Sequence, residues 1–178
     1  MGILKLNIPT VLTLSRIILI PVFVIVAYQH PFWGAAVFGI AAITDFLDGY
    51  LARRSGQITK FGIILDPLAD KFLVISALVV LVDMARLSAW MAIVIIVREF
   101  LVTGLRVVAL SKDIIIPAEM GGKLKTTAQI TAILCLILGE SIFDIDLHAV
   151  GMLFIWAALV LSVISGIQYT ISFWKKIK

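Results

Sequence analysis

The residues best suited to chemistry are four aspartates that stand close together in an otherwise apolar chain. They are Asp45, Asp48, Asp66 and Asp70. A carboxylate at the centre of a membrane helix costs about 2.5–3.5 kcal/mol, and neighbouring carboxylates also repel one another. A divalent cation bound by carboxylate oxygens would offset both costs. The sequence therefore predicts a metal site built by these four side chains.

The spacing of the aspartates suits two neighbouring antiparallel helices. The first pair is spaced i, i+3 and the second i, i+4, so each pair occupies one helical face. Asp45 lies nine residues before Arg54, or about 13 Å along a helix, and Asp70 lies about 15 Å beyond Lys60 by the same rise. If the two basic residues mark the membrane surface, both pairs of acids lie at similar depth. An antiparallel hairpin can then bring the two faces together.

The residues between the aspartates fit a phosphate site. Gly49 and Ala52 leave the helix surface bare one turn after the first acids, and Gly62 does the same on the facing segment. Arg53 can bind a phosphate through two parallel hydrogen bonds. Taken singly, the glycines could equally serve close packing of helices.

The composition is that of a membrane protein. Of the 178 residues 62% are hydrophobic and 15% charged, and the mean hydropathy is +1.14. Such a chain is too apolar for a soluble domain and too short for two large ones, so we expect a single membrane domain over residues 1–178. The only cysteine, Cys135, excludes an intrachain disulfide and a cysteine-based zinc site.

Apolar stretches predict an all-α integral membrane protein with six transmembrane helices. Each stretch approaches the roughly 20 residues that a bilayer requires. A short helix along the membrane interface could precede them, within residues 1–9. The six predicted spans are residues 10–28, 33–53, 61–82, 88–108, 124–140 and 149–172.

Basic residues divide between the two sides of the predicted membrane. They favour the cytoplasmic ends of helices, and on the opposite side only Arg86 is basic. Both termini and the aspartate site should therefore face the cytoplasm. The net charge of +4 reflects this sidedness, and it does not indicate nucleic-acid binding. The basic residues on the predicted cytoplasmic side are Lys5, Arg53, Arg54, Lys60, Arg106, Lys112, Lys123, Lys125, Lys175, Lys176 and Lys178.

The pattern D-x2-D-G-x2-A-R-x8-G-x3-D-x3-D, from Asp45 to Asp70, resembles the signature of the CDP-alcohol phosphotransferases. The resemblance implies a six-helix membrane enzyme, usually a homodimer, in which the aspartates hold two divalent ions on the diphosphate of a CDP-linked lipid. Oxygen ligands suit Mg²⁺ or Mn²⁺. The resemblance assigns the general base to Asp70, and we expect Asp45, Asp48 and Asp66 to be the principal metal ligands, with Asp70 sharing an ion.

Four further segments are similar to bacterial members of that family that act on sn-glycerol 3-phosphate. They are NIPTVLTLSR at 7–16, LDPLADK at 65–71, VREFLVTGLR at 97–106 and GKLKTTAQ at 122–129. The resemblance implies transfer of a phosphatidyl group from CDP-diacylglycerol to that acceptor, with release of CMP, at the bacterial cytoplasmic membrane. The last forty or so residues add little beyond a membrane helix.

The expected acceptor is a dianion and needs a basic pocket beside the metals. The candidates are Arg98, Arg106, Lys123 and Lys125. Arg98 is predicted to lie deep in a helix, where an unpaired guanidinium is expensive. An internal ion pair with Glu99 or with a neighbouring aspartate would explain it as well. Lys125 and Arg106 could instead be anchors at the cytoplasmic surface.

Two other functions remain open at the level of sequence. A sister enzyme that uses serine, an inositol phosphate or phosphatidylglycerol as acceptor could share the signature. A cation or proton transporter would also place acidic pairs and Arg98 in the membrane. It would not explain Gly49, Ala52, Arg53 and Gly62 at this spacing.

Overall fold

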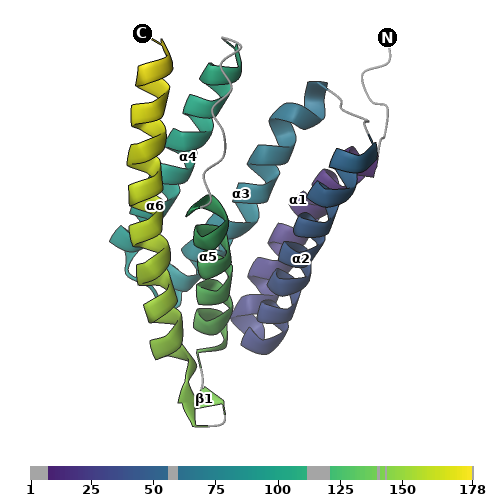
Figure 1. Cartoon of the computed structure of the whole chain (residues 1–178). Coiled ribbons are helices and arrows are strands. Elements are labelled where there is room, and N and C mark those ends of the chain that lie inside the picture. Colours follow the sequence, from purple (N-terminus) through teal and green to yellow (C-terminus); the bar gives the residue numbers. More distant parts are fainter. Residues whose placement is uncertain (1–7, 56–59, 112–120, 140, 143, 178) are drawn as a thin grey trace. The chain divides into compact units, whose positions relative to one another are not determined.

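The structure is a computed structural model. It describes the backbone of residues 8–55, 60–111, 121–139, 141–142 and 144–177, and the side chains of residues 18–44, 71–109, 124–139 and 144–176. Each of the six predicted stretches is a helix, with ends that differ from the prediction by a few residues (Figure 1). The helices are α1 (Ile8–Gln29), α2 (Pro31–Ser55), α3 (Lys60–Asp83), α4 (Ala89–Ser111), α5 (Gly121–Leu138) and α6 (Leu147–Ile177).

A short β-ribbon between α5 and α6 was not predicted. Strands β1 (Ser141–Ile142) and β2 (Ile145–Asp146) pair antiparallel, and Asp144 in the turn has a φ of 62°. Two-residue strands are too short to show the alternation by which a strand is predicted from sequence. At the other end of the chain α1 begins at Ile8, and the expected interfacial helix falls mainly on residues 1–7, which lie outside the described part.

By length and composition, one helix in the described part of the chain is long and apolar enough to cross a membrane. It covers Leu147–Lys176 in α6. Three shorter apolar helices cover Ile18–Gln29, Pro31–Thr44 and Leu124–Leu138. The described residues thus contain one span of full length.

The chain divides into two compact units, residues 1–80 and residues 81–178. In the first unit, α1 and α2 form an antiparallel hairpin about His30 (Figure 1). The rings of Phe23 and Phe38 meet across this hairpin with centroids 5.7 Å apart. Small buried residues such as Ala27 and Ala41 let the two backbones approach closely. These described contacts of α2 come from the part of the helix that precedes Asp45.

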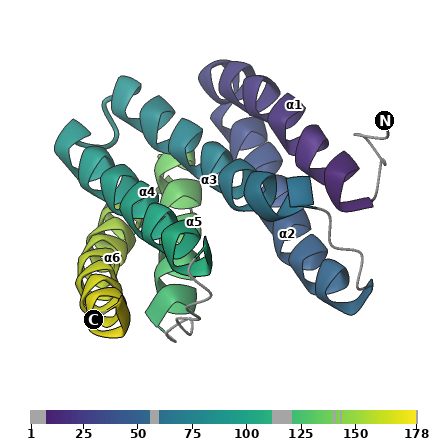
Figure 2. The same cartoon turned by 90° about the horizontal axis from the view of Figure 1, so that it is seen from above.

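The second unit is built around α6, which packs against both α4 and α5 (Figures 1 and 2). The core between these helices is apolar and includes Ile95, Ile133, Leu136 and Ile155, each no more than 1% exposed. Polar and charged side chains are buried in the same unit. They are Glu99, Lys125, Gln129, Ser162 and Ser165.

Candidate active site

The eight positions of the aspartate signature lie on two helices of the first unit. Asp45, Asp48, Gly49, Ala52 and Arg53 belong to α2, and Gly62, Asp66 and Asp70 belong to α3. The backbone is helical at all of them, so positions spaced i, i+3 and i, i+4 lie on one face of each helix, as predicted. The side chains of residues 45–70 lie outside the described part, and the metal cluster predicted there stays a prediction.

Two of the four predicted acceptor-binding cations meet at a single carboxylate in the second unit. Arg98 and Glu99 are neighbours on α4, and Lys125 comes from α5. Arg98 Nη1 donates to Glu99 Oε1 at 3.1 Å, and Lys125 Nζ donates to the same oxygen. The side chains of Arg98, Glu99 and Lys125 are 14%, 10% and 7% exposed. We call these three residues the charge triad.

The charge triad bears on two alternatives that the sequence left open. The ion pair of Arg98 with Glu99, proposed as an alternative to a pocket role, is present. A surface anchor does not describe Lys125, because its ammonium group is buried and paired with Glu99. Two cations and one carboxylate leave the triad with a formal charge of +1.

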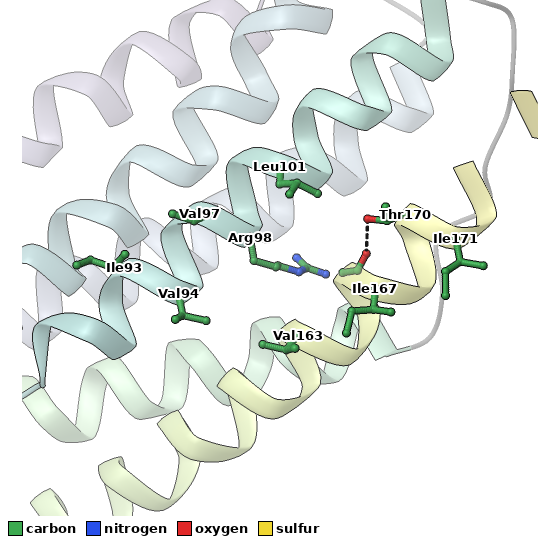
Figure 3. Close-up of a pocket in the computed structure, with 10 residues that line it drawn as sticks. Ile93, Val94, Val97, Arg98, Leu101, Val163, Ile167, Thr170 and Ile171 are labelled. Carbon is green, nitrogen blue, oxygen red and sulfur yellow. Dashed lines mark hydrogen bonds between the residues drawn. The ribbon is translucent and has the colours of Figure 1, made fainter. Parts of the chain in front are cut away.

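Arg98 also reaches across to α6 (Figure 3). Its Nε donates to the backbone oxygen of Ser162 at 2.8 Å, and its Nη2 donates to Ser165 Oγ at 2.5 Å. A Cβ at Gly166 would lie 3.0 Å from Arg98 Cγ, so the glycine gives the arginine stem room to cross. The guanidinium is thereby held between α4 and α6.

Sequence reasoning missed this contribution from α6, since it treated the last forty residues as a plain membrane helix. The available signal was the small and polar set Ser162, Ser165 and Gly166, spaced as neighbours on one face of an apolar helix. It could have indicated a polar contact, although not its partner. Glu99 was likewise considered only as a neutralising partner of Arg98.

Two further buried polar residues of the second unit, Gln129 and Ser162, have atoms without a hydrogen-bond partner in the described part of the chain. Gln129 lies one turn after Lys125 on the same face of α5, and it is 5% exposed. Within the described part of the chain, Gln129 Nε2 and Ser162 Oγ are buried without a hydrogen-bond partner. Buried polar atoms normally form hydrogen bonds with protein or water. These two atoms can therefore each form a further hydrogen bond inside the second unit.

On its other side Arg98 borders an apolar groove between α4 and α6. The groove has a volume of about 500 Å³ (Figure 3). Its wall is formed mainly by Ile93, Val94, Val97, Leu101, Val163 and Ile167. The lining also includes Thr170, whose hydroxyl donates to the Gly166 backbone oxygen. Among the described residues, the hydrogen-bond partners of Arg98 are Glu99, Ser162 and Ser165.

The remaining predicted cations are placed differently. Arg106 lies two turns beyond Arg98 on α4, is exposed, and holds its guanidinium carbon 5.9 Å from the ring centroid of Tyr169 on α6. This is a cation–π contact. Lys123 belongs to α5, but its side chain lies outside the described part. The structure therefore brings Arg98 and Lys125 together, and it leaves Arg106 apart from them.

Known proteins resemble this chain over nearly its whole length. The model of the CDP-alcohol phosphatidyltransferase family matches residues 6–164, which extend over both units. A Bacillus subtilis protein named CDP-diacylglycerol–glycerol-3-phosphate 3-phosphatidyltransferase is 42% identical over 97% of both chains. Proteins of the same name from Escherichia coli K12 and Wigglesworthia glossinidia brevipalpis are 41% and 35% identical, over 93% and 97% of this chain and 94% and 97% of their own.

Proposed function

Because the chain belongs to the CDP-alcohol phosphatidyltransferase family, we propose that it transfers a phosphatidyl group from CDP-diacylglycerol to sn-glycerol 3-phosphate. The products are phosphatidylglycerophosphate, a precursor of phospholipids, and CMP. One observation carries the proposal: relatives named for this reaction match at 35–42% identity over at least 93% of this chain and of their own.

The proposed setting is the bacterial cytoplasmic membrane. All six helices span it, both termini and the active site face the cytoplasm, and the two compact units form a single catalytic domain that works as a homodimer. The distribution of basic residues supports this orientation. The length and apolar character of α6 support insertion in the membrane.

The proposed metal site consists of Asp45, Asp48 and Asp66, with Asp70 sharing an ion. Their carboxylate oxygens are the donors that Mg²⁺ and Mn²⁺ prefer. Two bound ions would neutralise the diphosphate and stabilise the charge that develops on departing CMP.

The transfer itself is a substitution at phosphorus. A hydroxyl oxygen of the acceptor forms a new bond to the phosphorus of the phosphatidyl group, and the bond from that phosphorus to the CMP oxygen breaks. Asp70 accepts the proton that the hydroxyl loses. Gly49, Ala52 and Gly62 leave room for the CDP-lipid against the helix backbones, and Arg53 binds its phosphates.

The acceptor's phosphate is bound by the cations of the second unit. Arg98 and Lys125 form the centre of this site, since they are buried and converge on one carboxylate. Arg106 and Lys123 contribute nearer to the cytoplasmic surface. A phosphate dianion can accept hydrogen bonds from both cations at once, which supports a phosphorylated acceptor.

An acceptor panel tests the proposal. Purified protein is given radiolabelled CDP-diacylglycerol, a divalent ion and one of glycerol 3-phosphate, serine, inositol phosphate or phosphatidylglycerol, and CMP and the lipid product are measured. We expect phosphatidylglycerophosphate with the first acceptor and no lipid product with the others. Transfer to a different acceptor would replace the proposal by a sister reaction. Ion flux in proteoliposomes without CMP release would replace it by transport.

A further inference from the structure

Glu99 occupies a position that the proposed reaction does not yet explain. A single oxygen of its carboxylate accepts hydrogen bonds from Arg98 on its own helix and from Lys125 on α5. The side chain is 10% exposed. It is therefore the point at which the two cations proposed to bind the acceptor are joined.

Two like charges require such a carboxylate if they are to stay together in an apolar interior. Repulsion between buried charges is strong at low dielectric, and removal of one partner from a buried ion pair leaves an uncompensated charge. Arg98 is also fixed from the far side by Ser162 and Ser165 on α6. Without the carboxylate, Lys125 would lose the ion pair that holds it beside Arg98.

We propose that Glu99 is a positioning residue for acceptor binding, and this inference rests on the proposed function. Its carboxylate holds the guanidinium of Arg98 and the ammonium of Lys125 side by side before the acceptor arrives. The phosphate then meets a cation pair that is already assembled, and less ordering accompanies binding. Glu99 acts through the two cations and does not touch the reacting atoms.

A rival role makes the opposite prediction. If Glu99 merely neutralised the cations, its carboxylate would compete with the acceptor's phosphate for them. Its removal would then strengthen acceptor binding. The direction of the change in the acceptor's KM separates the two roles.

The experiment measures KM for glycerol 3-phosphate and for CDP-diacylglycerol in the full-length protein and in Glu99→Gln. We expect the acceptor's KM to rise about tenfold, the equivalent of one hydrogen bond to a charged group, with the KM for the CDP-lipid within twofold of wild type. Glu99→Asp keeps the charge on a shorter stem and should give an intermediate acceptor KM. Thr103→Val is the matched control, because it removes a hydrogen bond to the backbone oxygen of Glu99 and leaves the carboxylate in place.

A double-mutant cycle with Lys125→Met shows whether Glu99 acts through the cation pair. In the Lys125→Met background, Glu99→Gln should raise the acceptor's KM less than it does in wild type. An acceptor KM that is unchanged or lowered in Glu99→Gln, or equal changes for both substrates, overturns the inference.

The acceptor that wild-type protein uses separates this inference from the proposed function. If wild type uses another phosphorylated acceptor, the proposed function fails and the KM comparison is made with that acceptor. If it uses only acceptors without a phosphate, both fail.

Discussion

At the scale of single residues, the hydrogen bonds of Arg98 explain why an arginine is needed at this position. Three of its nitrogens donate to three different groups: the Ser162 backbone oxygen, Ser165 Oγ and Glu99 Oε1. The planar guanidinium can make such divergent bonds at once, and a lysine ammonium on a flexible stem cannot reproduce them.

Arg98→Lys should therefore weaken both acceptor binding and folding despite conserving the charge. We expect the acceptor's KM to rise about tenfold, and the free energy of unfolding to fall by about 1–3 kcal/mol, through loss of hydrogen bonds to a charged group. Steady-state kinetics and thermal unfolding in detergent measure the two effects. Wild-type values for both would show that the contacts of the guanidinium with α6 are dispensable.

Asp70 carries the proposed proton transfer. Asp70→Asn keeps the size of the side chain but removes its ability to accept a proton, so turnover should fall at least about a hundredfold. Binding of a CDP-lipid should be largely retained. It is measured as the protection against thermal unfolding that the lipid gives the protein. Full turnover in this variant would remove the general-base assignment, whereas loss of CDP-lipid binding would make Asp70 mainly a metal ligand.

At the scale of elements, the carboxyl end of α5 is closed by Arg86, from the α3–α4 connection. Its Nη1 donates to the backbone oxygens of Leu136, at 3.1 Å, and of Ile137. A cation at this end also complements the helix dipole. The charge of Arg86 is thus used within the protein, which is consistent with its place on the side predicted to be poor in basic residues.

Gly139 completes this cap and offers a test of it. Its φ of +61° is unfavourable for residues with a side chain, and a Cβ there would lie 2.7 Å from the Arg86 guanidinium carbon. Gly139→Ala should lower the free energy of unfolding by at least about 1–2 kcal/mol and leave both KM values unchanged.

Gly104→Ala in α4 is the matched control for this cap. An added Cβ there meets nothing within 4 Å, and alanine favours a helix by about 0.5–1 kcal/mol over glycine. Thermal unfolding in detergent should separate the two variants. Equal stability of the two variants would show that the cap formed by Arg86 and Gly139 does not contribute to the free energy of unfolding.

The elements differ in how far the sequence could predict them. Long apolar stretches gave the six helices, because hydrophobic length is the dominant signal in such a chain. The ribbon at Ser141–Asp146 and the cap at Arg86 depend on local turns and on contacts between distant segments, which no periodicity shows. The same holds for the charge triad. The sequence indicated Arg98 and Lys125 as pocket residues, but that they share Glu99, and that Arg98 reaches Ser162 and Ser165, follows from how α4, α5 and α6 pack.

At the scale of the whole molecule, the proposed orientation follows from the basic residues and can be measured directly. Cys135 is the only cysteine, so a Cys135→Ser background allows single-cysteine labelling. In intact cells, a membrane-impermeant maleimide should label Asp146→Cys, between α5 and α6. It should label Lys176→Cys, at the end of α6, only after lysis. The reverse labelling pattern would show that the protein has the opposite orientation, with the proposed site on the outer side of the membrane.

If the aspartates of α2 and α3 hold divalent ions on which the transfer depends, protein depleted of metal should lose its release of CMP. With both substrates present, chelator-treated protein should release no CMP, and added Mg²⁺ or Mn²⁺ should restore release in wild type. The control Asp144→Asn, in the β1–β2 turn, should be restored in the same way, whereas Asp45→Asn and Asp66→Asn should not be. Undiminished CMP release in excess chelator would show that the transfer does not depend on a divalent ion.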